Sequence, residues 1–377
     1  MLTKLTDVCT IQYGYAFNSD QFSETEGIPL IRIRDVIRGF SETRTTESFP
    51  DEYLVHDGDI LIGMDGEFNI ARWHGGTAAL NQRVCRLIPQ KVNPDYIFHF
   101  MPSALKAIED KTPFVTVKHL SAKELNKIVV PIPAPDVQIR IGTILNKIDE
   151  IIEFRQRQLL TLDNLIKARF VEMFGDMLIN PLNWPEQRLE TVAEIVSGIT
   201  KGRKIQTTEL FDVPYMAVSN VKDGYIDWTT VKTIAASQAE IDQYRLLPAD
   251  VLMTEGGDPD KLGRGAIIHN PPKDCIHQNH IFRVRLNQEY VLPEFMEQYL
   301  QQQRAKRYFL GCAKQTTGIA SINMTQLRGL PMLMPPMELQ KRFDTFVSQT
   351  DKSKAVVQKS LDEAKLLFES LMQKYFG

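Results

Sequence analysis

The sequence predicts an α+β protein in which two similar domains of irregular α/β fold are each followed by one long helix. Residues 130–154 and 332–356 lie 202 residues apart, and both contain a proline-rich stop followed by a Gln-led helix. Each helix carries a heptad pattern of apolar residues, and short β-branched runs occupy the domains between them. A repeat of this size determines the fold of the whole chain, so any short motif has to be interpreted within it.

The repeat extends well beyond the two helix starts. At the same spacing the matched pairs include Leu125 with Leu327, Pro133 with Pro335, Gln138 with Gln340, and Gly175 with Gly377. The upstream halves also correspond, with loops of different length: 28–40 resembles 213–225, 57–66 resembles 248–257, and 81–88 resembles 278–285. The chain is therefore a tandem duplication. We predict a first domain at 1–135, a first helix at 136–176, a second domain at 177–337 and a second helix at 338–377.

Short strands are expected in both domains, because β-branched runs alternate there with turn residues. The runs are 28–36, 58–63 and 83–88 in the first domain, and 213–221, 249–254 and 280–286 in the second. Short helices are expected near 95–109 and 293–308. The loops between the strands are rich in glycine and charge, and they differ most between the two copies. A shared frame with unlike loops is typical of a recognition module.

The two long helices carry apolar seams that cannot be left in water. Prolines upstream prevent an earlier start, and Asp136 and Glu338 favour the positive end of the helix dipole. Thr350 and Lys354 interrupt the second seam. A coiled-coil dimer between chains is one solution. We favour antiparallel pairing inside one chain over parallel pairing, because the chain must return across the inserted domain. The expected scaffold residues are Leu145, Ile148, Ile152, Leu159 and Leu162 on the first helix, and Val357, Leu361, Ala364 and Phe368 on the second.

The composition is that of an ordinary globular chain, with 377 residues, of which 43% are hydrophobic and 24% charged. The start, MLTKLTDVCT, lacks the apolar segment expected of a signal peptide, and no apolar run approaches the roughly 20 residues of a membrane span. The four cysteines, Cys9, Cys85, Cys275 and Cys312, have no paired spacing, which indicates a reducing cytoplasm. With 44 basic and 47 acidic residues, binding to DNA would need a local patch or a partner.

Two motifs suggest enzymatic or metal chemistry and lack its context. The segment HNPPKD (269–274) contains the Asn-Pro-Pro of amino-methyltransferases, but Lys273 stands where an aromatic residue would stack on a flipped base. No glycine-rich cofactor loop follows an upstream strand. Cys275, His277 and His280 crowd together with His269, yet their spacing fits no standard zinc site. We therefore expect no metal.

The acidic residues near the start of the 58–63 run could seed a nuclease site. They are Asp57, Asp59, Asp65 and Glu67. No carboxylate–x–Lys follows at strand spacing, and an acidic turn shared by Asp59 and Asp250 explains both residues without catalysis. No phosphate-binding Gly-x-x-x-x-Gly-Lys loop occurs either. We expect no catalytic residue in this chain.

The ordered, duplicated segments resemble the specificity (S) subunit of type I restriction-modification systems over essentially the full length. The resemblance rests on three pairs of segments: PIPAPDVQIRIGTILNKID with LMPPMELQKRFDTFVSQTD, GDILIG with ADVLMT, and LNQRVCRLIP with HQNHIFRVRL. The resemblance implies two pseudo-twofold related target-recognition domains, each reading half of a bipartite DNA site, separated by the antiparallel helix pair. It also implies two modification (methyltransferase) subunits, restriction subunits, and S-adenosylmethionine on the partners only. Two half-sites read from one side of the duplex lie about 34 Å apart, so helix length would act as a ruler.

The expected DNA contacts are polar residues of the unlike loops. Arginine suits guanine, asparagine and glutamine suit adenine, and lysine mostly meets phosphate. In the first domain we predict Tyr13, Arg34, Arg72, Asn81, Gln82 and Arg83. In the second domain we predict Lys201, Arg203, Ser219, Asn220, Lys261, Arg264, Asn279, His280 and Lys314.

Three other functions stay open at this stage. The chain could serve a system that methylates DNA without restricting it, since that difference lies in the partner genes. It could be a coiled-coil adaptor without a DNA role, which predicts no affinity for a specific half-site. A small methyltransferase would bind its cofactor as an isolated chain.

Overall fold

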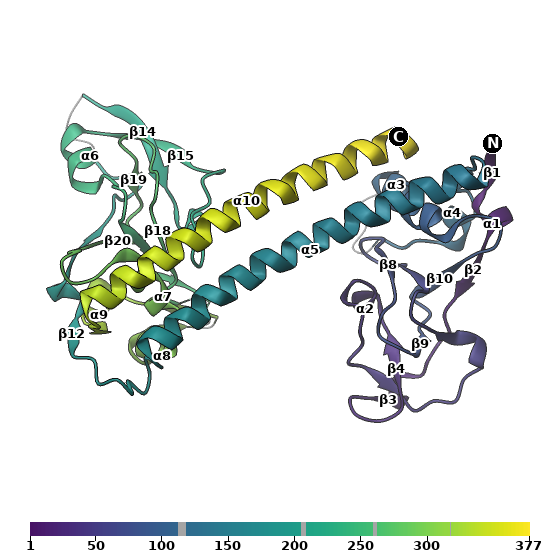
Figure 1. Ribbon diagram of the computed structural model, residues 1–377, viewed down its shortest axis with the longest axis horizontal. Helices are drawn as coiled ribbons and strands as arrows, with labels where there is room; N and C mark the ends of the chain where they lie inside the picture. Colours follow the sequence, from purple (N-terminus) through teal and green to yellow (C-terminus); the bar gives the residue numbers. More distant parts are fainter. Residues whose placement is uncertain (112–117, 205–208, 259–261, 317) are drawn as a thin grey trace. The chain divides into compact units, whose positions relative to one another are not determined.

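The computed structural model describes residues 1–111, 118–204, 209–258, 262–316 and 318–377 (Figure 1). These residues form two compact units. Unit 1 comprises Met1–Arg157 and Gln358–Gly377, and unit 2 comprises Gln158–Val357. Two 40-residue helices, α5 (Pro135–Phe174) and α10 (Met337–Phe376), contribute residues to both units.

Unit 1 is built on a four-stranded antiparallel sheet in the order β2 (Cys9–Tyr13), β10 (Val84–Pro89), β7 (Ile60–Gly63), β8 (Ile70–Arg72). A second sheet has the order β3 (Phe22–Ser23), β5 (Arg44–Thr45), β4 (Ile28–Ile31), β9 (Ala78–Leu80), β6 (Leu54–Val55). A third pairs β1 (Leu2–Lys4) with β11 (Val129–Pro131). The short helices are α1 (Leu5–Val8), α2 (Ile33–Arg38), α3 (Pro94–Lys111) and α4 (Ala122–Leu125).

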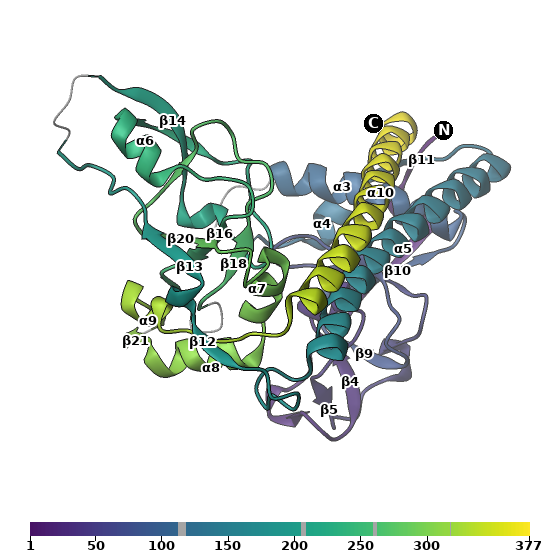
Figure 2. The same ribbon diagram turned by 60° about the vertical axis from the view of Figure 1, so that its left-hand side comes forward.

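Unit 2 repeats the four-stranded sheet in the order β13 (Ala193–Ser197), β20 (Ile281–Leu286), β16 (Val251–Thr254), β18 (Gly265–Ile267) (Figure 2). A second sheet has the order β15 (Lys232–Ala236), β14 (Phe211–Met216), β19 (Ile276–His277). A third has the order β17 (Gly256–Gly257), β22 (Ile319–Ser321), β21 (Lys314–Thr316). A fourth pairs β12 (Glu186–Arg188) with β23 (Pro331–Leu333). The short helices are α6 (Gln238–Tyr244), α7 (Pro293–Leu300), α8 (Gln303–Cys312) and α9 (Met324–Arg328).

The register of the strands confirms that the two units are copies of one design. In each unit the four-stranded sheet has corresponding strands in the same order, and a strand from the early part of the domain pairs in parallel with a later one. In unit 1 this pair is β4 with β9, and in unit 2 it is β14 with β19. The tandem repeat in the sequence is therefore a repeat of topology as well.

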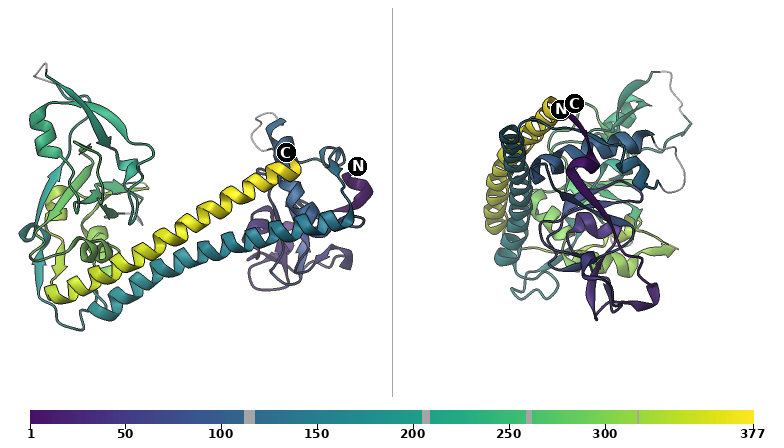
Figure 3. Two further views of the ribbon diagram at one scale, coloured as in Figure 1. Left: turned by 45° about the horizontal axis from the view of Figure 1, so that its top comes forward. Right: turned by 90° about the vertical axis from the view of Figure 1, so that its right-hand side faces the viewer.

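The long helices pair antiparallel within each unit, as predicted. In unit 1, Ile141 and Leu145 near the start of α5 belong to the same core as Phe368 and Phe376 near the end of α10. In unit 2 the opposite ends meet, since the Phe170 and Phe343 rings lie 5.5 Å apart. Figure 3 shows the two helices running alongside each other. This pairing inside one chain removes the need for a partner chain to cover the seams.

The predicted scaffold residues differ in burial. Leu145, Ile148, Leu361 and Ala364 are buried, whereas Ile152, Leu159, Leu162, Val357 and Phe368 are half-buried. The two polar residues of the second seam have local partners. The Thr350 hydroxyl donates to the Phe346 carbonyl at 2.9 Å, and the Lys354 ammonium lies 2.7 Å from the Asp163 carboxylate on α5. These partners make polar residues tolerable in an apolar seam.

The glutamine that opens each long helix fastens it to its own domain. In unit 1 the Gln138 side chain accepts from the Asn93 N–H and donates to the Pro133 carbonyl, both at 2.9 Å. In unit 2 the Gln340 side chain accepts from the Leu292 N–H at 2.9 Å and donates to the Pro335 carbonyl at 3.0 Å. Both side chains are buried, so the repeated Pro-Gln pattern is a joint between domain and helix.

Two expectations about short elements need correction. The runs 28–36 and 213–221 remain strand only to Ile31 and Met216, because the next residues form a helical turn. In each turn a buried side chain caps the backbone: Asp35 accepts from the Arg32 N–H, and Asn220 from the Ala217 N–H, both at 2.9 Å.

The helix expected near 293–308 is two helices, α7 and α8, and the second one buries Ala305 and Phe309 in the core of unit 2. Among the helices that the structure describes, none is both long enough and apolar enough to span a membrane.

Candidate nucleic-acid interface

A tight turn at residues 81–83 of unit 1 leads into β10. The Val84 N–H donates to the Asn81 carbonyl at 2.9 Å, and the Asn81 side chain accepts from the Arg83 N–H at 3.2 Å. The Gln82 N–H donates to the Tyr15 carbonyl at 2.9 Å. Asn81 is buried by these contacts, while Gln82 and Arg83 are exposed. The turn therefore presents two polar side chains from a fixed backbone.

Unit 2 builds the same turn at residues 278–280, before β20. The Ile281 N–H donates to the Gln278 carbonyl at 2.9 Å, and the Asn279 N–H donates to the Ile199 carbonyl at 3.0 Å. His280 is exposed and Asn279 is half-buried. The backbone contacts match those of unit 1, so the turns differ in their side chains and not in their framework.

A glycine stands under each turn because the backbone approaches it too closely for a side chain. A Cβ on Gly14 would lie 2.1 Å from the Asn81 oxygen, and a Cβ on Gly198 would lie 2.0 Å from the His277 oxygen. No Cβ is tolerated at such a distance from backbone, so glycine is required at both positions.

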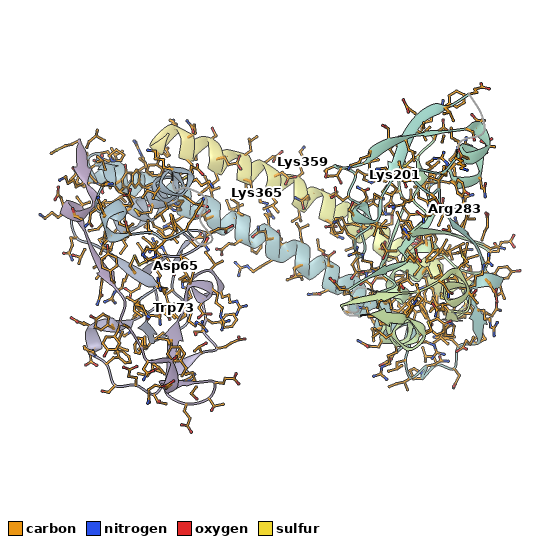
Figure 4. The ribbon with its side chains drawn as sticks, turned by 180° about the vertical axis from the view of Figure 1, so that it is seen from behind. Asp65, Trp73, Lys201, Arg283, Lys359 and Lys365 are labelled. Carbon is orange, nitrogen blue, oxygen red and sulfur yellow. The ribbon has the colours of Figure 1, made fainter. Side chains whose placement is uncertain are left out.

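An acidic residue beside each turn binds its basic side chain. Asp65 follows β7, and Figure 4 labels it in unit 1. Its Oδ2 lies 3.4 Å from Arg83 Nη1, and its Oδ1 lies 2.5 Å from His119 Nδ1. Glu255 follows β16, and its Oε2 lies 2.5 Å from His280 Nδ1. In the sequence Asp65 stands out only as a possible nuclease residue, and neither Glu255 nor His119 is predicted as a site residue. The signal available is an acid within two residues after each of two matched strands.

Three of the predicted DNA contacts brace their own unit. Arg72 Nη2 lies 2.6 Å from Asp95 Oδ1, and its guanidinium lies over the Phe98 ring. Arg203 donates twice to Glu240, which lowers the pKa of that carboxyl to about 2. Asn220 is fully buried, and both N–H groups of its amide donate within unit 2, to the Asp227 carbonyl and the Thr230 hydroxyl. Internal contacts account for these side chains without DNA.

The remaining predicted contacts have varied surroundings. Arg34, Lys201, Ser219 and Lys314 are exposed. The Arg264 Nε and the Tyr13 hydroxyl are buried without a hydrogen-bond partner among the described residues. Lys261 lies outside the described residues. Each of these assignments stays a prediction. Gln82 and Arg83 lie together on the turn of unit 1, and Asn279 and His280 lie together on the turn of unit 2.

The acidic turn shared by the two domains has a structural role. Asp59 accepts from the His56 N–H and Asp250 from the Leu247 N–H, at 2.9 and 2.7 Å. Each carboxylate also pairs with an arginine of the neighbouring strand, Arg86 at 2.9 Å and Arg285 at 2.8 Å. Within the part of the chain that the structure describes, no group of three His, Cys, Asp or Glu residues is arranged to hold a metal ion.

Comparison with known proteins explains the duplicated architecture. Residues 1–164 and 181–366 each match the family described as Type I restriction modification DNA specificity domain. The chain is 27% identical to the type I restriction enzyme EcoBI specificity subunit of Escherichia coli, covering 99% of this chain and 84% of that protein. It is 21% identical to the EcoKI specificity subunit of Escherichia coli (strain K12), covering 100% and 88%.

Two solved structures share the fold over the whole chain. The type I restriction-modification S subunit from M. genitalium has a TM-score of 0.59 at 13% identity, covering 100% of this chain and 96% of that one. A chain from a structure concerned with complex assembly and conformational transition of the type I R-M system has a TM-score of 0.54 at 16% identity, covering 100% and 97%. With the family matched twice over most of its length, the chain belongs to the type I restriction-modification DNA specificity family.

Proposed function

We propose that this chain reads an asymmetric bipartite DNA target, with one half-site recognised by each unit. The observation that carries the proposal is the repeated strand-end turn, which keeps its backbone contacts while residues 81–83 and 278–280 carry different side chains. Two turns with the same backbone contacts and different exposed side chains suit two half-sites of different sequence. Side chains that reach base edges supply sequence information, whereas backbone contacts only fix the register.

The chain itself would carry out no chemistry on DNA. Methyl transfer would belong to modification subunits that bind S-adenosylmethionine, and cleavage to restriction subunits. Net charge near zero is compatible with this division, because partners can supply much of the phosphate contact. One of the solved structures that share this fold concerns complex assembly of the type I R-M system, which supports a role as a scaffold.

Exposed apolar residues on the long helices support a docking surface that occurs twice. Phe154 and Val356 occupy matched positions and are 52% and 71% exposed. Leu165 and Leu367 occupy another matched pair and are 47% and 51% exposed. Large apolar side chains exposed at the same positions of both helices favour contact with a protein partner. Matched positions on both helices favour two copies of one partner, and we assign them to modification subunits.

The decisive experiment is to map methylated positions in host DNA with and without this gene. We expect a bipartite motif that disappears on deletion and returns on complementation. An unchanged methylation pattern would contradict the proposal and favour the adaptor function. A modification-only system gives the same methylation result, so it is separated by challenging the host with unmethylated phage DNA. Loss of phage titre that depends on this gene indicates restriction.

A further inference from the structure

We infer that Asp65 and Glu255 are positioning residues for base readout. Asp65 orients Arg83 in unit 1, and Glu255 orients Asn279 through His280 in unit 2. The inference rests on the proposed function and deepens it, because it assigns a base to each turn. An arginine presented in this way suits the two acceptors of guanine, and an asparagine suits the acceptor and donor of adenine.

In unit 1 the carboxylate fixes a reader whose other donors remain available. Asp65 Oδ2 lies 3.4 Å from Arg83 Nη1, and the Met64 N–H holds the Arg83 carbonyl at 3.0 Å. The Asp65 side chain is 18% exposed, whereas that of Arg83 is 55% exposed. A guanidinium has five N–H donors, so one ion pair orients it and leaves donors for an outside acceptor.

In unit 2 the same kind of support passes through an imidazole. His280 Nδ1 lies 2.5 Å from Glu255 Oε2, and its Nε2 lies 3.3 Å from Asn279 Nδ2. Because an amide nitrogen only donates, Nε2 accepts, and Nδ1 carries the proton that is donated to Glu255. The asparagine then keeps one N–H and its Oδ1 for a base.

The backbone of Asn279 is held on both sides, which makes it a rigid platform for that side chain. Its N–H donates to the Ile199 carbonyl at 3.0 Å, and its carbonyl accepts from the Ser197 hydroxyl at 2.7 Å. A reader fixed before binding loses less conformational entropy on contact with DNA. The Glu255, His280 and Asn279 chain therefore preorganises one amide.

The repetition argues against an accidental ion pair. The Met64 N–H binds the Arg83 carbonyl, and the Glu255 N–H binds the His280 carbonyl, so Glu255 matches Met64 and Asp65 lies one residue further along its strand end. A carboxylate near DNA phosphates is unfavourable, and in unit 1 the Arg83 guanidinium offsets its charge. Both units place an acid within two residues after this strand, although the residues of the turn differ. A turn brace alone would not explain why the acid binds the exposed side chain.

The test uses the full chain assembled with its modification subunits. Motifs are mapped by sequencing methylated DNA for wild type, Asp65→Ala and Glu255→Ala, with Glu67→Gln as the control. Glu67 is exposed and lies two residues from Asp65. Asp65→Ala should relax one guanine position in one half-site, and Glu255→Ala one adenine position in the other. Discrimination at that position, measured with single-base variants of the DNA, should fall by roughly 5- to 150-fold.

The reader variants decide whether the acids act through the assigned side chains. Arg83→Ala and Asp65→Ala should relax the same position, and the double variant should be no worse than Arg83→Ala alone. Asn279→Ala and Glu255→Ala should behave in the same way. The unaffected half-site in each variant reports that the assembly is folded.

Each other outcome points to a different failure. A wild-type assembly with no bipartite motif would overturn the proposed function. With the motif present, an unchanged motif in Asp65→Ala and Glu255→Ala would overturn only the inference. Binding weakened equally for all sequences, with base preference intact, would also overturn it, because the acids would then be simple braces.

Discussion

His277 at the end of β19 is a buried imidazole that has to stay neutral. Its Nδ1 donates to the Ile281 carbonyl at 3.1 Å, and its Nε2 has no hydrogen-bond partner among the described residues. Burial lowers the pKa of His277 to about 3. In the same unit burial raises the pKa of Glu297 to about 7, and this carboxyl accepts from the Ile267 N–H at 3.0 Å. The two groups change the stability of unit 2 with pH in opposite directions.

The His277→Gln substitution should make unit 2 less sensitive to acid than the wild type. The folded pKa of His277 lies below its unfolded value. The stability that the neutral imidazole contributes to unit 2 is therefore complete above pH 6.5 and is lost progressively as the pH falls toward 3. Relative to the variant, the wild type should lose about 1.4 kcal/mol per pH unit below 6.5. Hydrogen exchange of the β20 amides at pH 7.5, 6.0 and 5.0 measures this difference. Glu297 is common to both proteins and cancels, so equal slopes would contradict the assignment.

At the scale of elements, the helix seam should dominate the stability of unit 1. Leu145 on α5 is fully buried in a core that includes Tyr96 and Leu105. Leu145→Ala should lower the free energy of unfolding by about 2–5 kcal/mol, because it removes apolar contacts and leaves a cavity. Leu366→Ala on α10 is the matched control, since Leu366 is exposed and lies in the same unit, and should change the free energy of unfolding by less than about 0.5 kcal/mol. Hydrogen exchange of the α3 amides, followed in urea, separates the two variants.

The exposed helix residues should behave in the opposite way. Combining Leu165→Asp with Leu367→Asp should leave folding intact, because both side chains already face solvent. Association with each modification subunit should weaken by at least 10-fold, because each of the two interfaces would then hold one desolvated charge. Titration by analytical ultracentrifugation measures the loss. Lys365→Asp is the control, because Lys365, which is labelled in Figure 4, is exposed on α10 close to Leu367. Wild-type affinity in the double variant would refute this docking face.

At the scale of the molecule, α5 and α10 are the only helices that contribute residues to both units among those that the structure describes. One heptad inserted at matched points in both helices adds about 10 Å of helix and keeps the seam in phase. The recognised motif should gain on the order of 3 base pairs of spacer, while both half-sites keep their sequence. Methylation mapping reads the motif directly. An altered half-site with an unchanged spacer would show that the helices do not set the distance.

The apolar heptads and the proline-rich segments of the sequence determined the duplicated pair of long helices. Proline stops upstream of Gln138 and Gln340 and the apolar heptads after them were enough to predict two long helices and their antiparallel pairing. These signals are local, because the helix period and the proline ring act within a few residues. The same local signals misassigned 28–36 and 213–221 as continuous strands, since a cap from Asp35 or Asn220 is invisible to a propensity argument.

The tertiary structure alone decided which polar residues face outward. Arg72, Arg203 and Arg83 look equivalent in the sequence, yet the first two are held by Asp95 and Glu240 inside their units, and the third remains exposed. The acids that hold Arg83 and His280 lie 18 and 25 residues away in the chain. Such pairs form across strands, where register sets the neighbours. One sequence carries no local mark of that register, so the residues that support each reading turn emerge only in the folded protein.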